Sequence, residues 1–375
     1  MPTEPSNLRV VIAYKNFAMH ASQGISHIGL GVSALNNVKM LQKAGVRAET
    51  LGLKYDTDLR KFLNLQASGT DQPITHVIIS APWIRTQMLQ YLCSTFPMVQ
   101  FAVNCHSNVG FLQADTNGIR LIREGLALES GTHNFRICGN SQRFCRFIYH
   151  GYGSPCGYLP NMYFFDGTTN PHRPSWPTTR GVLRIGAFGA TRTLKNFLTS
   201  CGAALEISRD LKAQTEIWIN TQRDDGPETA RIIRAAHMML DDLPNISLKY
   251  LGWKAWPDFR KAVGNMHLCL QNSFTESFNM VTCDAIAEGV SSVVSDAIDW
   301  APDTWKAHAD DVFDIARVGV GLINDPLAPI TGYRAVKNHN RESLQAWYRF
   351  LGLSHHNAHA SAAHDLHDAG DIAGF

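Results

Sequence analysis

The sequence lacks the features of a membrane-spanning, secreted or zinc-binding protein. No uninterrupted apolar run reaches the roughly 20 residues that cross a bilayer, because Pro82 already breaks THVIISAPWI. The chain enters the apolar stretch LRVVIAY almost at once, without the basic start, long apolar core and cleavage site of a secretory signal. Its eight cysteines never form a C-x-x-C pair, which favours free thiols over disulfides or a zinc site. We therefore expect a soluble, cytoplasmic protein.

Charged residues make up only 18% of the chain, and the two signs are unevenly distributed. Residues 1–165 carry 14 Lys and Arg against 8 Asp and Glu, whereas residues 166–375 carry 20 against 24. A basic surface attracts and holds anionic partners. The first half is therefore expected to meet such a partner, although solvated surface charges can give the same count by chance.

Short β-branched or apolar runs alternate with helical patterns along the first half. The predicted strands are residues 9–14, 47–53, 75–80, 98–106 and 135–141, and a helix is predicted at 33–45. Strands that are buried on both faces and separated by helices form a parallel sheet. The first half is therefore predicted to be an α/β domain.

A second series follows the Pro-rich stretch 166–181, which has the composition of a linker. Because one core rarely serves 375 residues, we predict α/β domains at 1–165 and 182–336, and their sheet edges would face each other across a cleft. The predicted strands of the second domain are 182–189, 215–220, 246–253 and 267–273, and its helices are 194–211 and 256–266.

The end of the chain is predicted to hold one helix and a tail. The amphipathic segment 340–351 indicates a helix within 337–353 that packs back on the first domain. The tail, 354–375, has five histidines but no apolar stripe. We interpret it as flexible, with metal binding as the alternative.

Gly29-x-Gly31-x-x-Ala34, with Glu49 further on, superficially matches a dinucleotide-binding fingerprint. That fingerprint requires its first glycine directly after a strand, whereas 14 residues separate Tyr14 from Gly29. The spacing therefore argues against NAD. Two interpretations remain: a glycine-bearing loop before a helix N-terminus, which suits a phosphate, or glycines that only allow close packing.

The second half contains two basic and two acidic residues of the types that bind a nucleotide. Arg192 and Lys195 fall between a strand and a helix, where they can clamp a diphosphate, although loop cations are often only solvated. Glu276 is expected in a loop, and Asp284 about one turn inside the following helix. Asp284 would then either stabilise the helix dipole or accept hydrogen bonds from a ribose diol.

Two further sets of side chains have a structural and a functional interpretation. Asp56 and Asp58 have the Asp-x-Asp spacing of one kind of metal site, but they precede a helix without the strand that such a site needs. We therefore interpret them as N-terminal caps. His106 ends the strand 98–106, where a histidine serves either acid/base chemistry or the structure.

Together these motifs resemble the retaining GT-B glycosyltransferases of glycosyltransferase family 4, over most of residues 8–352. The segment TESFNMVTCDAIAEG is similar to the E-x7-E element of that family, with Asp284 in place of the second glutamate. GAFGATRTLKN is similar to its G-R-x-x-x-x-K loop, with Lys195 in register, Ala190 at the arginine position and Arg192 two residues later. The resemblance implies a GT-B fold of two Rossmann-like domains.

The resemblance also implies a role for individual residues. His106 and Glu276 would be catalytic, both beside the reacting sugar, and Asp284 would bind the ribose. The leaving diphosphate would be stabilised by cations and a helix dipole, without a metal or other cofactor. The residues expected to bind the donor are Gly29, Gly31, Arg192, Lys195, Trp253, Phe278, Asn279, Met280, Val281 and Asp284.

The implied reaction moves a sugar from a nucleotide sugar, most simply a UDP-sugar, to a hydroxyl of an anionic acceptor, with retention of configuration. The first half also resembles glycosyltransferase-like reading frames of phages and bacteria, which is compatible with DNA that carries a hydroxymethylated pyrimidine as acceptor. A polysaccharide or a lipid-linked acceptor is the alternative. The side chains that would either contact a DNA acceptor or serve only the core or the surface are Phe17, His20, Trp83, Arg85, Phe111, Arg143 and Arg146.

Two functions of other classes remain open. An NAD(P)-dependent oxidoreductase would need the segment around Gly29 to hold a dinucleotide. A non-catalytic sugar- or nucleic-acid-binding protein would keep the same fold without turnover. The joint presence of Glu276, Asp284, Arg192 and Lys195 argues against the non-catalytic protein.

Overall fold

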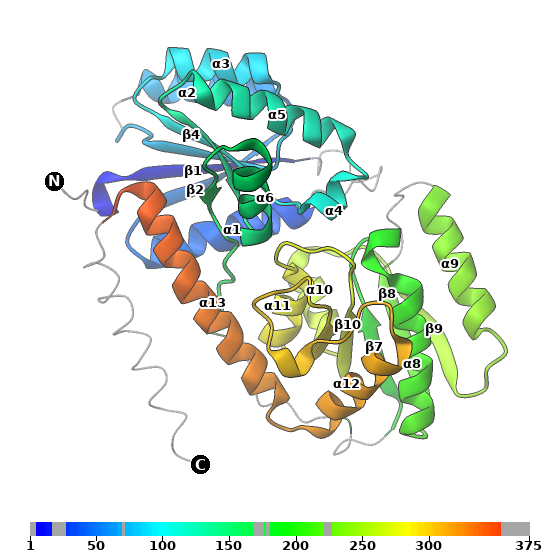
Figure 1. The fold of residues 1–375 in the computed structure, drawn as a ribbon. Helices are drawn as coiled ribbons and strands as arrows, with labels where there is room; N and C mark the ends of the chain where they lie inside the picture. Colours follow the sequence, from blue (N-terminus) through cyan, green and yellow to red (C-terminus); the bar gives the residue numbers. More distant parts are fainter. Residues whose placement is uncertain are drawn as a thin grey trace. The chain divides into compact units, whose positions relative to one another are not determined.

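The structure is a computed structural model that describes residues 5–16, 28–69, 72–167, 176, 181–220 and 227–353. Two compact units make up this part of the chain (Figure 1). Unit 1 contains the described residues up to 164 and from 340 onward, and unit 2 contains those between 165 and 339. Most of the expected linker, the His-rich tail, Phe17 and His20 lie outside the described residues.

Unit 1 contains a six-stranded parallel sheet with the order β2-β1-β3-β4-β5-β6. Its strands are β1 (Arg9–Lys15), β2 (Arg47–Leu53), β3 (His76–Ser80), β4 (Gln100–Cys105), β5 (Phe135–Gly139) and β6 (Gly157–Tyr158). Its helical segments are η1 (Pro5–Asn7), α1 (Ile28–Lys43), α2 (Asp56–Ala67), α3 (Thr86–Thr95), α4 (Val109–Leu112), α5 (Thr116–Ser130) and α6 (Gln142–Tyr152).

Successive side chains of a strand point to opposite faces, and both faces of this sheet are covered. Val11 and Ala13 pack in a core with α2, α3 and α5, whereas Val10 and Ile12 pack in a second core with α1 and residues 344–351 (Figure 1). All four side chains are at most 1% exposed. Burial on both faces explains why the middle of β1 is a continuous apolar run that could be predicted from the sequence.

The last part of α13 (Ala328–Leu351) belongs to unit 1. Trp347 is fully buried there, and its indole N–H donates to the carbonyl of Pro160 at 2.9 Å. The side-chain amide of Asn340 accepts from the N–H of Tyr163 at 2.9 Å and donates to its carbonyl at 2.6 Å. Asn37 adds a hydrogen bond to the N–H of Met162 at 2.8 Å. These side chains satisfy the backbone of residues 160–163, which lies outside the sheet.

Unit 2 contains a five-stranded parallel sheet with the order β11-β10-β7-β8-β9. Its strands are β7 (Leu183–Ala187), β8 (Thr215–Asn220), β9 (Ile246–Leu251), β10 (Leu268–Gln271) and β11 (Ser292–Val294). Its helical segments are η3 (Thr193–Lys195), α8 (Phe197–Asp210), α9 (Pro227–Leu240), α10 (Trp256–Val263), α11 (Met280–Ala287), η4 (Asp303–Trp305), α12 (Val312–Asn324) and the first part of α13.

The strand order of unit 2 reverses between β7 and β10. Strands β8 and β9 extend the sheet from one side of β7, and β10 and β11 extend it from the other. In a doubly wound sheet, the loops at such a switch point diverge and leave a crevice at the carboxyl ends of the strands. The topology of unit 2 therefore indicates the loops after β7 and β10 as the place where a ligand would bind.

Most predicted strands are confirmed, and the errors lie at short strands and helix starts. The strand at 47–53 matches β2, while the two-residue β6 and three-residue β11 were not predicted. The helix predicted at 33–45 already begins at Ile28, and the helix predicted at 340–351 already begins at Ala328. Across the described ranges, no helix combines the length and the apolar character that a bilayer crossing requires.

Two helical glycines provide a matched test of packing in unit 2. A Cβ atom on Gly332 of α13 would lie 2.3 Å from the Trp305 ring, which is fully buried, whereas one on Gly321 of α12 would meet nothing within 4 Å. Gly332→Ala should therefore lower the free energy of unfolding by about 1–3 kcal/mol. Gly321→Ala should leave it unchanged or raise it by up to about 1 kcal/mol, because alanine favours helix. Urea denaturation measures both, and equal effects would contradict this packing.

Candidate functional site

The loops that follow β7 and β10 are joined by hydrogen bonds across the switch point of unit 2. The N–H of Phe274 donates to the carbonyl of Leu194 at 3.0 Å, and the side-chain amide of Asn196 donates to the carbonyl of Asn272 at 3.1 Å. The amide of Gln271 donates to the carbonyl of Phe188 at 3.0 Å. The two loops are thus fixed to each other at the point where ligands bind in doubly wound sheets.

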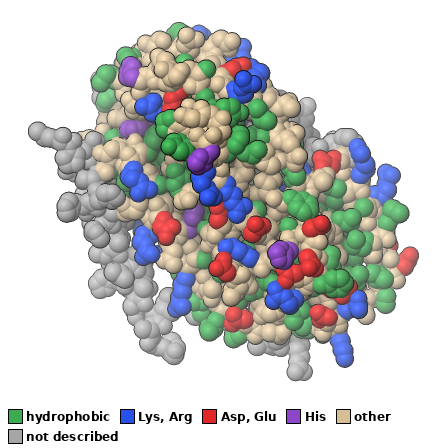
Figure 2. Space-filling model, in the orientation of Figure 1, with side chains coloured by type: hydrophobic (Ala, Val, Ile, Leu, Met, Phe, Trp, Pro, Cys, Tyr) green, Lys and Arg blue, Asp and Glu red, His purple; other side chains and the backbone are tan. Residues whose placement is uncertain are grey.

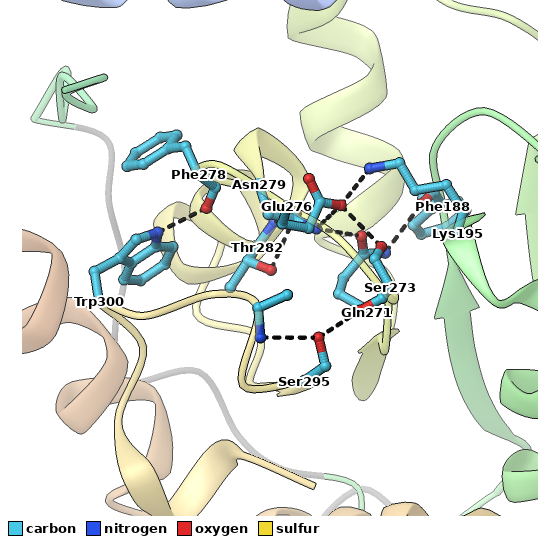
Figure 3. Close-up of polar contacts among 11 residues, drawn as sticks. Phe188, Lys195, Gln271, Ser273, Glu276, Phe278, Asn279, Thr282, Ser295 and Trp300 are labelled. Atoms are coloured by element: carbon cyan, nitrogen blue, oxygen red, sulfur yellow. Dashed lines mark hydrogen bonds and ion pairs between the residues drawn. The ribbon is translucent and has the colours of Figure 1, made fainter. Parts of the chain in front are cut away.

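One carboxylate oxygen lies at the centre of this arrangement (Figure 3). Oε1 of Glu276 accepts hydrogen bonds from the ammonium of Lys195, from Oγ of Ser273 at 2.8 Å and from Nδ2 of Asn279 at 3.0 Å. The side chain of Glu276 is 10% exposed and that of Lys195 is 33% exposed. Three donors on one ionised oxygen make a strong, directional contact and hold the carboxylate in a single orientation.

Asn279 links this carboxylate to the start of α11. Its backbone has φ +69°, in the left-handed region, where asparagine is tolerated better than most residues. Its Oδ1 caps the helix by accepting from the N–H of Thr282 at 2.9 Å, and its Nδ2 donates to Oε1 of both Gln271 and Glu276 at 3.0 Å. One buried side chain therefore caps α11 and orients Glu276.

The N-terminus of α11 is the part of the expected phosphate loop that remains partly exposed. The first N–H groups of a helix have no acceptor within it, so Met280 and Val281, both partly exposed, present theirs outward with the positive end of the dipole. The side chains of Phe278 and Asn279 are buried. The backbone carbonyl of Phe278 accepts a hydrogen bond from the indole N–H of Trp300 at 2.6 Å. The centre of the Phe278 ring lies 5.3 Å from that of the His339 ring.

The loop after β7 contains a glycine that its backbone requires. Gly189 has φ +116°, and its N–H donates to Oδ1 of Asn220 at 3.0 Å. A small pocket lies between this loop, the start of α8 and the end of β10. Lys195 lines it, whereas Arg192 and the start of α11 do not. The lining residues are Ala187, Phe188, Gly189, Ala190, Thr191, Lys195, Phe197, Ser200, Leu270, Gln271 and Ser273.

Arg192 lies immediately before η3 and close to Glu228, an acid that no sequence motif indicated. The carboxylate of Glu228, in the first turn of α9, accepts from the N–H of Thr193 at 2.8 Å and from its hydroxyl. These hydrogen bonds, with a smaller contribution from the charge of Arg192, lower the pKa of Glu228. Glu228 is therefore ionised at neutral pH and offsets part of the positive charge expected here.

Asp284 and Trp253 lie beyond the start of α11. Asp284 is 2% exposed, and its Oδ1 accepts from the indole N–H of Trp256 at 2.9 Å. Its predicted place about one turn inside a helix is confirmed. Trp253 is 36% exposed and lies between β9 and α10. A ribose that binds Asp284 would therefore share that carboxylate with Trp256.

The remaining predicted site residues belong to unit 1. Gly29 and Gly31 lie in the first turn of α1, so the predicted glycine loop is wrong at these positions. A Cβ atom on Gly31 would lie 3.0 Å from the Tyr14 ring, which supports the close-packing interpretation. His106 directly follows β4, and burial lowers its pKa to about 4, so the imidazole is neutral at neutral pH.

The acidic pair at the start of α2 serves the structure. Asp58 accepts from the N–H of Tyr55 at 2.9 Å, and Asp56 forms an ion pair with Arg85 at 2.6 Å. The capping interpretation is confirmed for Asp58, which accepts from the backbone of the N-cap residue Tyr55, and is wrong for Asp56, which is the first residue of α2 and pairs with Arg85 instead. No group of three or more His, Cys, Asp or Glu side chains that could hold a metal ion occurs within the described ranges.

Solved structures with the same architecture include a glycosyltransferase and UDP-forming synthases. A glycosyltransferase from Rickettsia africae has a TM-score of 0.62 at 11% identity, over 93% of this chain and 100% of that one. A UDP-forming α,α-trehalose-phosphate synthase from Burkholderia xenovorans has a TM-score of 0.61 at 12% identity, over 95% and 99%.

A further structure, of an E. coli trehalose-6-phosphate protein bound with UDP-2-fluoro glucose, has a TM-score of 0.59 at 11% identity, over 89% of this chain and 96% of that one. No family model and no curated protein matches the sequence. The two parallel sheets and these structural likenesses show that the chain has the GT-B fold.

Two substitutions at Asn279 separate its backbone role from its side-chain role. Asn279→Gly keeps a residue suited to φ +69° but removes the cap of α11 and the hydrogen bond to Glu276. Asn279→Ala removes the same bonds and also places a Cβ in the left-handed region. The alanine variant should therefore unfold with about 1–2 kcal/mol less free energy than the glycine variant. Guanidinium denaturation compares them, and equal stabilities would show that this backbone conformation is not the native one.

The depressed pKa of His106 predicts acid sensitivity. Because its pKa falls from 6.5 in the unfolded chain to about 4 in the folded protein, the unfolded state binds more protons between these values. Stability present above pH 6.5 is then lost as the pH falls toward 4. Between pH 7 and pH 5, wild type should lose up to about 2 kcal/mol more free energy of unfolding than His106→Gln. His133→Gln, at an exposed position, is the control, and it should lose as much as wild type.

Proposed function

We propose that this protein is a glycosyltransferase that moves a sugar from a UDP-sugar to a hydroxyl of an anionic acceptor. The observation that carries the proposal is the contact of Lys195 with the Asn279-oriented Glu276, beside the start of α11 and at the switch point of unit 2. The GT-B neighbours that form UDP or bind a UDP-sugar support the choice of donor. The sequence resemblance supports membership of family 4 and retention of configuration.

Lys195 and the N–H groups of Met280 and Val281 would bind the diphosphate. Without donor, the ammonium of Lys195 is neutralised by Glu276, which limits the attraction of other anions. A diphosphate carries more charge than one carboxylate and competes for the ammonium. Glu276 keeps its hydrogen bonds from Ser273 and Asn279 and so stays in place beside the donor sugar. Cations and the dipole of α11 then stabilise the leaving group, so the proposal needs no metal.

Asp284 and Trp253 would bind the nucleoside. Asp284 is already held by Trp256, so the carboxylate is oriented before a ribose arrives. Trp253 is the exposed aromatic residue between β9 and α10, where its ring can pack against a base. Arg192 would also attract the phosphates, and the negative charge of Glu228 would offset part of that attraction.

The basic residues of unit 1 support an anionic acceptor. Residues 130–165 contain no Asp or Glu, while Arg136, Arg143 and Arg146 lie among them. The exposed side of α6 adds Tyr149, which is 60% exposed, and Figure 2 shows hydrophobic side chains gathered over this helix. Exposed aromatic rings among cations suit stacked bases beside phosphates.

Within this class of acceptor, DNA with a hydroxymethylated pyrimidine is proposed ahead of an acidic polysaccharide or a lipid-linked acceptor. The neutral imidazole of His106 would hydrogen-bond the reacting sugar.

Binding of UDP tests the donor part of the proposal without knowledge of the acceptor. A thermal-shift panel of UDP, UDP-glucose, UDP-N-acetylglucosamine and NADH should raise the unfolding midpoint with the uridine ligands and not with NADH. Lys195→Ala should abolish most of that rise. Lys261→Ala is the matched control, because its side chain is 79% exposed and pairs only weakly with Asp258 at 3.5 Å.

Three outcomes would reject the proposed donor site. The first is no shift of wild type with any uridine ligand at millimolar concentration. The second is an undiminished shift in Lys195→Ala. The third is a shift with NADH alone, which would favour an oxidoreductase.

A further inference from the structure

Four cysteines of unit 1 converge on the carboxyl end of its sheet. Cys105 ends β4, Cys138 lies in β5, Cys145 lies on α6, and Cys156 directly precedes β6. The strand register places Cys138 opposite Gly157, the residue after Cys156. The first two thiols are at most 1% exposed, whereas Cys145 and Cys156 are only partly buried. The accessible members of the group are therefore Cys145 and Cys156.

The sulfurs of Cys145 and Cys156 meet at one carbonyl group. Sγ of Cys145 lies 3.5 Å and Sγ of Cys156 lies 3.7 Å from the carbonyl oxygen of Gly157. Both thiols point to this one acceptor, so the two side chains lie next to each other. A second carbonyl, of Gly139, lies 3.7 Å from Cys145. The two sulfurs are thus neighbours at one shared carbonyl before any oxidation.

The two thiols are chemically unequal. The neighbouring thiol of Cys156 lowers the pKa of Cys145, whereas the neighbouring Cys145 and burial raise the pKa of Cys156. The thiolate is the nucleophile in thiol–disulfide exchange, so Cys145 is the attacking residue and Cys156 the resolving one. Burial raises the pKa of both Cys105 and Cys138, which makes these neighbours poor nucleophiles.

We propose that Cys145 and Cys156 form a dithiol site that low-molecular-weight disulfides oxidise to an intramolecular disulfide. The Cys145 thiolate attacks one sulfur of glutathione disulfide and releases one glutathione thiolate. Cys156 loses its proton to solvent and attacks the Cys145 sulfur of the mixed disulfide, which releases the second glutathione. Two protein thiols are oxidised, and one glutathione disulfide is reduced to two thiols.

The segment between the two cysteines can accommodate this bond. The sulfurs must approach to about 2.05 Å, closer than in a hydrogen bond. The chain leaves α6 through Gly153, at φ +66° in the left-handed region, and Gly151 and Gly153 are exposed. The bond would tie α6 to β6. Because β6 leads into the residues held by Asn37 and Asn340, oxidation would stiffen this edge of unit 1.

Disulfide mapping of the full chain tests the proposal. The reduced protein is incubated in glutathione buffers of increasing disulfide content, alkylated with iodoacetamide, digested and analysed by mass spectrometry. Wild type should lose two alkylatable thiols and yield one linked pair of peptides that contain Cys145 and Cys156. Its thermal midpoint should rise by about 4 °C or more, because the bond removes conformational freedom from the unfolded chain.

Two variants identify the order of attack. Cys156→Ser should stop at the mixed disulfide of glutathione on Cys145, whereas Cys145→Ser should form neither product. Cys105 and Cys138 serve as internal controls, because they should react only after denaturation. Persistence of all the free thiols in oxidising buffer, or a bond from Cys145 to Cys138, would overturn the proposal. Glutathione on Cys156 in the Cys145→Ser variant would contradict the assigned order.

Discussion

The candidate site depends on one carboxylate oxygen that holds two loops together. Oε1 of Glu276 receives the ammonium of Lys195 from the loop after β7, and the side chains of Ser273 and Asn279 from its own loop. Loss of one partner from a largely buried ion pair leaves the other charge uncompensated, which is costly. This contact therefore fixes the position of the two loops as well as the charge of the site. The capped start of α11 is fixed through the same asparagine.

The topology explains why these residues meet although about 80 positions separate Lys195 from Glu276. Strands β7 and β10 are neighbours in the sheet, but their chains leave it toward helices on opposite sides. The loops that follow β7 and β10 lie outside the sheet and have no strand-to-strand hydrogen bonds. Side-chain amides therefore satisfy their backbone groups. Gln271, Asn196 and Asn220 each satisfy a backbone group of these loops. The two loops are thus held in place by side-chain amides, independently of the charged groups.

Much of the fold could be predicted from the sequence, because the inner strands of the two sheets are mostly buried and apolar, whereas the edge strands β2 and β9 are more exposed. Glu276, Lys195 and Asp284 were selected because the spacing of their motifs is local. Glu228 and Trp256 were missed, since their partners Thr193 and Asp284 lie 35 and 28 residues away. The glycine loop was predicted wrongly because Gly29 and Gly31 suggest a turn, whereas both lie in α1, where Gly31 packs closely against the Tyr14 ring. The double role of Asn279 follows from its left-handed backbone, which no sequence pattern revealed.

The most direct test of the account is a crystal structure of the protein with UDP bound. The account predicts that the diphosphate contacts the ammonium of Lys195 and the N–H groups of Met280 and Val281, while Glu276 keeps its hydrogen bonds to Ser273 and Asn279. A diphosphate bound away from both Lys195 and the start of α11 would contradict it.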